Sequence, residues 1–410
     1  PFSHLPRAPD PTLTPPLSGE MSPRGTNILI FIFSALVAGN SGGGERVGVT
    51  RHGRSHRRAK ARKSFPGKNK WLGAASVGGK IIAIPSHSNS ILKLSTYPSD
   101  TPKIETFGRL PRGKFQWLRG VVARDKCIYG IPCWSSTLIR INPETEQITI
   151  KESPAVTGGR WQWHGGCLGS DGRIYGVPSN ADRVLRIDPE TLTGTLIGPE
   201  FSGQNKWYGG IEGANGCIYC IPYTAQNVLM INPKTGYVDT IGESFPISEW
   251  KWHGGVRSPD GRYIIGIPSH STQVLKIDTL TSKVTLIGPK FPGRYKWGGA
   301  CVGRDGLVYG IPSDYDRVLV VNPEIEEVKV MEIEGGSTLI GRKNLWQGAV
   351  LADNGAIYAI PCDSTSVLKI DPDSQVIKIL GELPEGGDKW QGGILGQDGG
   401  IYGIPQNSEN

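Results

Sequence analysis

The feature that most constrains the fold of this chain is a repeat that occurs eight times, at intervals of 44 to 49 residues. Each copy begins with a tryptophan, and an Ile-Pro or Val-Pro pair follows 14 to 16 residues later. The tryptophans are Trp71, Trp117, Trp163, Trp207, Trp252, Trp297, Trp346 and Trp390, and the prolines are Pro85, Pro132, Pro178, Pro222, Pro268, Pro312, Pro361 and Pro405. Such a period is typical of propeller blades or other solenoid units.

Each repeat has the pattern of four short antiparallel strands, as residues 165–198 show. A first strand follows the tryptophan, and Asp171-Gly172 then leads into the second strand, "IYGVP". Asp-Gly and Asn-Gly pairs recur at this place in other copies and favour tight hairpins because they accept positive φ angles. The third strand is "VLRIDP" and the fourth is "TLIG". No helical period of useful length intervenes, which excludes parallel βαβ units.

The second and third strands of each repeat are apolar at successive positions, which predicts a sheet that is covered on both faces. Neighbouring blades of a closed ring would supply this cover. We therefore expect an all-β fold, a β-propeller of four-stranded antiparallel blades over residues 65–410. Seven repeats are complete, whereas the eighth ends at "IPQNSEN" after two strands. We favour an eight-bladed, C-terminally truncated ring over seven blades with a spare hairpin.

The order of first strand, Asp-Gly turn, Ile/Leu-Tyr strand and Val-x-x-Ile-Asp strand resembles that of the YVTN, NHL and streptogramin-lyase-like β-propellers. The resemblance covers residues 65–410 and implies the propeller fold. The recurring tryptophan and the Ile-Pro pair depart from that pattern. The resemblance therefore assigns no family activity to the chain.

The first 64 residues have a different composition from the repeats. Residues 1–20 are rich in proline and are interpreted as a non-native or upstream translated segment. Residues 21–39 have the layout of a signal peptide, with one basic residue before the apolar run 28–38 and small residues after it. Eleven residues are too few to span a bilayer, so no transmembrane span is expected. These features predict the secretory pathway or the extracellular space.

Residues 40–64 are predicted to be a basic disordered linker or a pro-segment. They contain "RHGRSHRRAKARK", which has no apolar period and cannot bury a face. A basic tail of this kind is expected to contact a polyanion or a membrane surface. The alternative is an organelle transit segment behind the signal peptide.

The net charge of +8 belongs to this tail, because residues 40–70 contain ten Lys and Arg against one Glu. The repeats are close to neutral, which argues against nucleic-acid binding at the propeller, since phosphate neutralisation dominates such binding. The seven cysteines show no metal-binding spacing, and most stand at repeat positions where other copies have Val, Ala, Ser or Gly. We expect them to be small core residues.

Two positions of the repeat vary from copy to copy while their surroundings stay constant. The residue after the tryptophan is Leu72, Leu118, His164, Tyr208, His253, Gly298, Gln347 or Gln391. The residue two places after the Ile-Pro pair is His87, Trp134, Asn180, Thr224, His270, Asp314, Asp363 or Asn407. Both positions are expected on the face that carries the longer loops, where propellers commonly bind ligands.

From these series we predict ligand-binding residues, a metal site and candidate catalytic groups. The ligand-binding candidates are His164, Tyr208, His253, Gln347, Gln391, Trp134 and Asn180. If the series converge, His270, Asp314 and Asp363 could hold a divalent cation, Ca or Mg, and no other cofactor is expected. His164 or His253 could act as a general base near neutral pH.

Two further predictions concern residues that serve the fold. Glu212 and Arg257 occupy equivalent positions in adjacent repeats, and an ion pair between them near the ring axis is expected. The recurring tryptophan is predicted to wedge between blades. The alternative for the tryptophan is a ring of stacking platforms for a flat ligand.

Three functions are compatible with this pattern. The favoured one is a secreted or lumenal binding module that recognises a glycan or protein ligand on its long-loop face, where the tryptophans lie. The alternatives are a propeller hydrolase or lyase that uses loop His and Asp residues with a divalent cation, and a non-catalytic interaction scaffold. Fold alone cannot choose among them.

Overall fold

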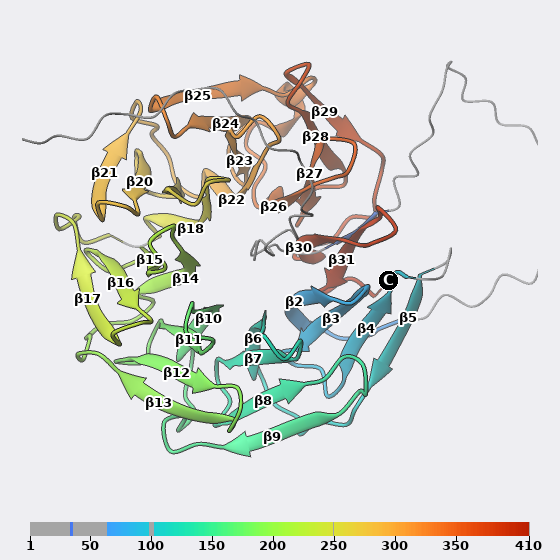
Figure 1. Cartoon of the computed structure of the whole chain (residues 1–410). Coiled ribbons are helices and arrows are strands. Elements are labelled where there is room, and N and C mark those ends of the chain that lie inside the picture. Colours follow the sequence, from blue (N-terminus) through green and yellow to red (C-terminus); the bar gives the residue numbers. More distant parts are fainter. Residues whose placement is uncertain (1–32, 36–63, 98–101, 249, 410) are drawn as a thin grey trace, which may run out of the picture.

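The computed structural model describes residues 33–35, 64–97, 102–248 and 250–409. Eight antiparallel sheets stand around a central axis, and the first strand of each repeat is the innermost strand of its sheet (Figure 1). The chain therefore forms the predicted β-propeller. The only helix among the described residues is the short 3-10 helix η1 (Gly336–Leu339), which lies in a loop.

Blades one to seven each contain four strands in sequence order. Blades one and two consist of β2 (Trp71–Val77), β3 (Lys80–Pro85), β4 (Ile91–Ser95), β5 (Lys103–Phe107), β6 (Trp117–Val122), β7 (Ile128–Pro132), β8 (Thr137–Ile141) and β9 (Ile148–Glu152). Blades three and four consist of β10 (Trp163–Leu168), β11 (Ile174–Pro178), β12 (Val184–Asp188), β13 (Thr193–Ile197), β14 (Trp207–Glu212), β15 (Ile218–Pro222), β16 (Val228–Asn232) and β17 (Tyr237–Ile241).

The remaining complete blades have the same order. Blades five and six consist of β18 (Trp252–Arg257), β19 (Tyr263–Pro268), β20 (Val274–Asp278), β21 (Lys283–Ile287), β22 (Trp297–Val302), β23 (Val308–Pro312), β24 (Arg317–Asn322) and β25 (Glu327–Glu332). Blade seven consists of β26 (Trp346–Leu351), β27 (Ile357–Pro361), β28 (Val367–Asp371) and β29 (Val376–Leu380).

The eighth repeat supplies two strands, β30 (Trp390–Leu395) and β31 (Ile401–Pro405), which take an eighth place in the ring. They pack on blade one, where Ile394 and Tyr402 share an apolar cluster with Trp71. The backbone N–H of Phe65 also donates to the carbonyl of Glu409 at 2.8 Å. The hairpin is thus part of the ring, as in the favoured eight-bladed prediction, and does not hang off seven closed blades.

A three-residue strand, β1 (Phe33–Ala35), pairs antiparallel with the free edge of β31. Phe33 lies opposite Gly403, and Ala35 lies opposite Ile401. These three residues belong to the segment predicted as a signal peptide. The rest of that segment, residues 1–20 and residues 40–63 lie outside the described residues, so the predictions for them stay predictions.

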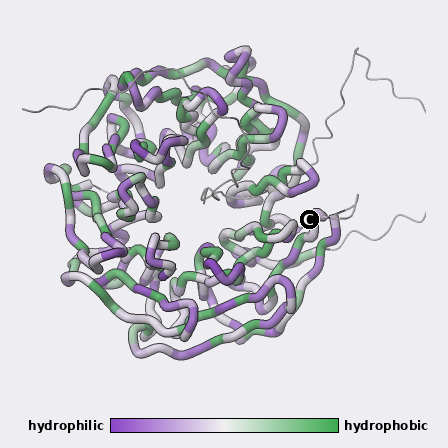
Figure 2. Tube along the Cα trace, in the orientation of Figure 1, coloured by the Kyte–Doolittle hydropathy of each residue, from purple (hydrophilic) through white to green (hydrophobic). Residues whose placement is uncertain are grey.

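The core lies between the blades, where the second and third strands of each blade are buried on both faces, as predicted. The second strand of blade three, for example, is buried at every position from Ile174 to Pro178. The outer strands are more exposed and mix polar with apolar residues (Figure 2). Burial on both faces explains why the inner strands show no polar alternation.

The eight repeat tryptophans are core residues, with 0% to 7% of each side chain exposed. In blades one to seven the indole Nε1 donates to a backbone carbonyl at the start of the third strand, as from Trp163 to Arg183 at 3.0 Å. This burial confirms the packing role. It also excludes the alternative in which these tryptophans offer stacking faces to a ligand.

A buried lysine precedes five of these tryptophans and joins successive blades. The Nζ atom of Lys296 donates to the carbonyls of Ser269, Ser271 and Gly293 at 2.7 to 3.0 Å. Burial lowers the pKa of this ammonium to about 8, and the carbonyls offset part of the cost of burying its charge. Equivalent lysines are Lys70, Lys206, Lys251 and Lys389. This role was not predicted from the sequence, although Lys-Trp recurs in the repeat.

The cysteines and the Glu212–Arg257 pair show one confirmed and one wrong prediction. All seven cysteines are free thiols, and all but Cys301 are buried, as expected of small core residues. Arg257, however, donates to the backbone carbonyl of Glu212 at 3.0 Å. Within the described part of the chain, the guanidinium thus bonds to the backbone of Glu212, and the two side chains form no salt bridge.

No helix in the described part of the chain is long and apolar enough to cross a membrane.

Candidate ligand-binding site

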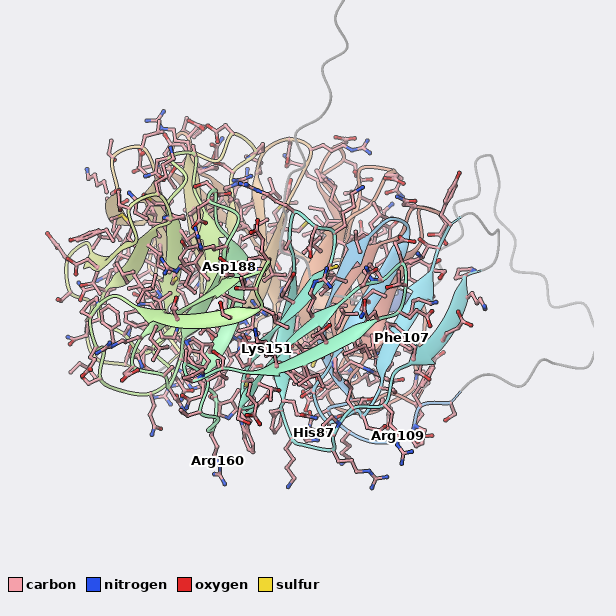
Figure 3. All side chains as sticks on the ribbon, turned by 60° about the horizontal axis from the view of Figure 1, so that its bottom comes forward. His87, Phe107, Arg109, Lys151, Arg160 and Asp188 are labelled. Carbon is pink, nitrogen blue, oxygen red and sulfur yellow. The ribbon has the colours of Figure 1, made fainter. Side chains whose placement is uncertain are left out.

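The candidate site lies on the face of the ring that carries the longer loops. These loops join the second strand to the third within a blade and the fourth strand to the next blade. Figure 3 shows His87, Arg109 and Arg160 at this face and Asp188, the last residue of β12 before its tight turn to β13, toward the opposite one. Both variable positions lie at this face, because each repeat tryptophan begins its strand there and each Ile-Pro or Val-Pro pair ends its strand there.

Every innermost strand begins with a β-bulge, which aims the residue after the tryptophan. In blade three Trp163 pairs with Pro178 and Gly166 with Gly176, so β10 has one residue more than β11 between these pairs. The same register shift occurs in all eight blades. Bulges of this kind redirect side chains and are frequent beside functional sites.

The two glycines that follow His164 have different reasons to be glycine. Gly165 lies in the bulge with a φ of 78°, which favours a residue without Cβ. Gly166 has an ordinary φ, but a Cβ there would lie 2.8 Å from the carbonyl oxygen of Tyr175 on the paired strand. The first glycine therefore shapes the bulge, and the second allows close approach of the strands.

The bulges bring together four side chains near the ring axis, which we call the inner cluster: Arg119, His164, Tyr208 and His253. The rings of His164 and Tyr208 are 3.8 Å apart between centroids, and those of Tyr208 and His253 are 4.6 Å apart. The guanidinium of Arg119, from blade two, lies 5.2 Å from the centroid of the Tyr208 ring. His164, Tyr208 and His253 were predicted as ligand-binding residues, and Arg119 was not.

Burial and the charge of Arg119 control protonation within the inner cluster. Burial, and then Arg119, lowers the pKa of His253 to about 4. The same two causes, with His253 as a third, hold the pKa of His164 well below its usual value. Burial also raises the pKa of the Tyr208 hydroxyl. Both imidazoles are therefore neutral near pH 7 and keep one donor and one acceptor nitrogen each.

Outside the inner cluster, eight rings form a second group, which we call the aromatic arc. Its members are His87, Phe115, Trp134, Trp161, Tyr223, Trp250, His270 and Tyr295. In blades one to three the contacts run from His87 to Phe115 at 4.4 Å and from Phe115 to Trp134 and Trp161 at 5.0 and 4.8 Å. Except for the buried Tyr223, the arc residues are partly or largely exposed.

The second half of the arc continues over blades four to six. Tyr223 contacts Trp250 at 4.8 Å, and Tyr295 contacts Trp250 at 5.1 Å and His270 at 4.4 Å. The inner cluster connects the two halves, because Trp161 stacks on His164 at 6.4 Å and Tyr223 on Tyr208 at 5.5 Å. A nearly continuous apolar surface with polar edges thus crosses six blades.

Several arc residues occupy one recurring position, two places before the repeat tryptophan. All eight residues at this position have a left-handed backbone with φ from 47° to 57°. The position holds Asn69, Phe115, Trp161, Asn205, Trp250, Tyr295, Asn344 or Asp388. Asn and Asp accept this conformation readily, whereas bulky residues rarely adopt it.

Where this position is polar, its backbone N–H donates a hydrogen bond to a side chain of the previous blade. The backbone N–H of Asn205 donates to Asn180 at 2.8 Å, and that of Asn344 donates to Asp314 at the same distance. The N–H of Asp388 donates to Asp363 at 2.7 Å. Asn180, Asp314 and Asp363 therefore each accept a hydrogen bond that ties two blades together, whatever further role they have.

The structure does not bring the predicted metal ligands together. Among the described residues, the group of three ligand-type side chains within 4.8 Å of one another is Cys362, Asp363 and Asp388. His270 is absent from that group and packs on Tyr295, while Asp314 binds Asn344. A divalent cation, Ca or Mg, stays a prediction that the described side chains do not strengthen.

The other predicted ligand-binding residues fall on two parts of the ring. Trp134 belongs to the aromatic arc, with its indole nitrogen buried and without a hydrogen-bond partner. Gln347 and Gln391 are partly buried at the inner position of blades seven and eight, across the axis from β14 (Figure 1). The Oε1 atom of Gln391 is also buried without a hydrogen-bond partner.

Sequence reasoning missed Arg119, Phe115, Trp161, Trp250 and Tyr295. A signal for each was present in the repeat. Trp161 and Trp250 are, with Trp134, the three tryptophans outside the repeat register. Arg119 stands where the other copies have glycine. Phe115 and Tyr295 share the position of Trp161, but its backbone conformation is not visible in the sequence.

The long-loop face of blades one and two also contains two adjoining pockets. One, of about 380 Å³, is lined by Trp134, Lys114 and Ser135 among others. The other, of about 710 Å³, is lined by His87, Arg112 and Lys114 among others. Both are open hollows of the surface and not enclosed cavities.

Comparisons with known proteins agree with this architecture. Virginiamycin B lyase from Staphylococcus aureus superposes with a TM-score of 0.54 and 13% sequence identity, covering 72% of this chain and 92% of that one. A streptogramin B lyase gives a TM-score of 0.53 at 13% identity, covering 72% and 91%. A protein from Lactobacillus plantarum gives 0.52 at 14% identity, covering 77% and 96%.

What these proteins share with the chain is the propeller fold. At such identities the likeness carries no residue roles and no activity. The sequence matches no known family of proteins and no curated protein. The function therefore has to be argued from the side chains of the long-loop face.

Proposed function

We propose that this chain is a binding module that recognises a glycan by stacking sugar rings on the aromatic arc. The observation that carries the proposal is the set of Phe115, Trp161, Trp250 and Tyr295 at a left-handed backbone position that suits Asn or Asp better. Bulky residues held in such a conformation call for a reason outside the fold. Ligand contact supplies that reason.

The repeat itself supports this argument. Asn69, Asn205, Asn344 and Asp388 fill the same position in the other four blades, and the ring forms there with hydrogen bonds between blades. The fold therefore does not need aromatic rings at this position. Large rings with a polar edge nearby are suited to ligands that present both C–H groups and hydroxyls, as sugars do.

The polar groups near the arc fit the same ligand class. Ser135, Ser88 and Asn89 line the two pockets beside Trp134 and His87. These side chains offer hydroxyl and amide groups next to the stacking surfaces, which is how small-ligand sites combine apolar walls with a few orienting polar groups. The rings also need little ordering, since an aromatic side chain has two rotatable bonds.

We also propose that the protein acts in the secretory pathway or outside the cell, as the apolar run 28–38 and the small residues after it predict. N-terminal sequencing of the secreted protein tests this proposal. A mature chain that begins near residue 39 or 40 is expected, and a chain that keeps residues 28–38 would contradict it.

The binding proposal is tested with Trp161→Asn and Trp250→Asn, which install the residue that Asn205 and Asn344 already supply at this position. Binding to a glycan array, followed by isothermal titration with the best neutral oligosaccharide, is the measurement. We expect each variant to lose about tenfold or more in affinity, the usual cost of removing an anchor residue.

Asn344→Ala is the matched control, because it changes the same repeat position in a polar blade. It should leave glycan affinity unchanged. If no glycan on the array binds the protein, the proposal is wrong. If the protein captures a protein ligand through the same two tryptophans, the arc is a binding surface for proteins instead.

A second candidate function is catalysis at the inner cluster. The neutral His253 and His164 beside Arg119 and Tyr208 favour it, because an unprotonated imidazole can accept a proton. Turnover of a bound oligosaccharide that disappears in His253→Gln, with affinity retained, would support this reading. Binding without turnover supports the module.

A further inference from the structure

Arg119 occupies a position at which the other seven innermost strands have glycine. The residue two places after the repeat tryptophan is a glycine with φ from 72° to 118° in those strands. In blade two the residue is Arg119, and it has the same left-handed conformation, with a φ of 64°. An arginine adopts this backbone at a cost that glycine avoids, so the bulge itself gives no reason for it.

The side chain of Arg119 extends from blade two across blades three and four. An ideal Cβ on Gly165 would lie 3.3 Å from its Nη1 atom, and one on Gly209 would lie 3.4 Å from the same atom. The glycines of the next two bulges therefore leave the space through which the arginine passes. Its guanidinium ends beside the ring and side-chain oxygen of Tyr208.

The groups around this guanidinium are hydrogen-bond donors and neutral rings. Tyr208 offers a hydroxyl, and His164 and His253 each offer one ring N–H in their neutral form. The Nδ1 atom of His164 is buried without a hydrogen-bond partner in the structure. Tyr208, His164 and His253 remain partly exposed, whereas Arg119 is 9% exposed beneath them.

The loops near blades one to three add further positive charge to that of Arg119. The described loop residues 64–70, 86–90, 108–116, 133–136 and 153–162 contain no Asp or Glu. Their basic residues are Lys68, Lys70, Arg109, Arg112, Lys114 and Arg160. In the loops of blades seven and eight, residues 362–366, 381–389 and 406–409 carry Asp363, Glu382, Glu385, Asp388 and Glu409 with the single base Lys389. An anionic ligand would be drawn to the side where Arg119 begins.

We propose that Arg119, with His164, Tyr208 and His253, binds a carboxylate of the ligand, so that the glycan recognised by the aromatic arc is an acidic one of the uronate class. This inference rests on the proposed function, because the arc supplies the stacking surface for the sugar ring. Arginine presents a planar pair of N–H groups that matches a carboxylate, and the neutral donors nearby complete its coordination.

Arg119→Gly is the variant that tests the inference. Glycine is the residue of the other seven blades at this position, so the variant keeps the bulge and relieves its strained backbone. Its thermal melting temperature should equal or exceed that of the unchanged protein. Arg119→Lys is the second variant, since it keeps the charge and loses the planar pair of donors.

The probes are oligosaccharides derived from pectin, alginate and hyaluronan, each measured by titration calorimetry before and after chemical reduction of its carboxyl groups. For the probe that binds most tightly, we expect the acidic form to bind at least tenfold more tightly than its reduced form. Arg119→Gly should abolish this difference and leave the affinity for the reduced form unchanged. Arg119→Lys should keep a small part of the preference.

The outcomes separate this inference from the proposed function. Equal binding of acidic and reduced probes, with loss of both in Trp161→Asn, would overturn the carboxylate site and leave glycan binding intact. A preference that survives in Arg119→Gly would also overturn it. Failure of every acidic probe to bind overturns it as well, and the neutral glycan array then decides separately on the proposed function. A large fall in the melting temperature of Arg119→Gly would show that Arg119 serves the fold.

Discussion

Seven of the eight boundaries between blades are built in one of two ways, although their backbones are the same. Where blades three and four, six and seven, seven and eight, and eight and one meet, a polar side chain accepts a hydrogen bond from a left-handed residue of the next blade. Where blades one and two, two and three, and five and six meet, two rings take these positions, as His87 and Phe115 do. The first solution serves the ring, and the second adds an exposed surface that the ring does not require.

Both kinds of boundary contain the buried lysine, and its substitution is expected to have the largest effect on stability. Lys296→Met removes three hydrogen bonds to carbonyls between blades five and six. We expect a loss of roughly 3 kcal/mol in the free energy of unfolding, because these carbonyls are left without a donor. Chemical denaturation measures it.

Lys389→Met is the matched control, since within the described part of the chain the Nζ atom of Lys389 donates to one carbonyl, that of Gly386 at 2.9 Å. It should cost less than half as much. Equal losses in the two variants would show that packing of the lysine stem, and not its hydrogen bonds, stabilises the boundary.

The inner cluster, which joins the two halves of the aromatic arc, is expected to make the protein sensitive to acid. Burial and Arg119 lower the pKa of His253 to about 4. Between this value and about 6.5 the unfolded chain binds a proton that the folded chain does not, so stability falls as the pH falls through this window. The expected loss is about 2 kcal/mol, because a pKa unit corresponds to about 1.4 kcal/mol and His253 is partly exposed.

Denaturation curves at pH 7 and pH 4 measure this acid sensitivity, with His253→Gln as the comparison. Glutamine does not titrate, so the variant should lose less stability than the unchanged protein over the same interval. The same slope in both proteins would assign the acid sensitivity to other groups.

The polar boundaries are expected to carry stability and no ligand contact. Asp363→Ala removes the acceptor for the backbone N–H of Asp388 and for the side-chain amide of Asn344. A loss of about 1 to 2 kcal/mol in unfolding free energy should follow, with glycan affinity unchanged. A fall in affinity with stability retained would place Asp363 in the ligand site.

The aromatic boundaries are expected to show the opposite behaviour, with the smallest effect on stability. Trp161→Asn loses ring contacts with Phe115 and Trp134 but relieves a bulky residue at a φ of 53°. The free energy of unfolding should therefore change by no more than about 0.5 kcal/mol. A loss above about 2 kcal/mol would show that Trp161 stabilises the ring and would weaken the argument for a ligand.

The sequence predicted the blades well because their signals are local. The tryptophan, the Asp-Gly turn and the Ile-Pro pair lie within one repeat, and eight copies of a weak pattern reinforce each other. The convergence of His164, Tyr208 and His253 followed from the same logic, since equivalent positions of adjacent blades must be neighbours. The expected Glu212–Arg257 ion pair failed because equivalent positions fix which residues are near, and not which atoms bond.

The site beyond these three residues depended on features that a repeat alignment does not contain. Asp314 and Asp363 read as metal ligands in the sequence, whereas in the structure each accepts a backbone N–H of the next blade. In the sequence nothing distinguishes Phe115 and Trp161 from other loop residues. Their left-handed backbone, which marks them as unusual, is visible only in the structure. Such hydrogen bonds and φ angles arise from chain segments that meet only when the ring has formed.

The stretch "WHGG" at residues 163–166 illustrates what can be learned from the sequence and what from the structure. From the eight copies in the sequence it follows that the tryptophan is constant, that glycine recurs two and three places after it in most copies, and that the residue between changes. Only the tertiary structure decided why, since the first glycine lies in a bulge and the second meets the carbonyl of Tyr175 on the paired strand. The structure also shows that Arg119 lies in the equivalent bulge of blade two, with a left-handed backbone that arginine rarely adopts. Its side chain reaches Tyr208 two blades away.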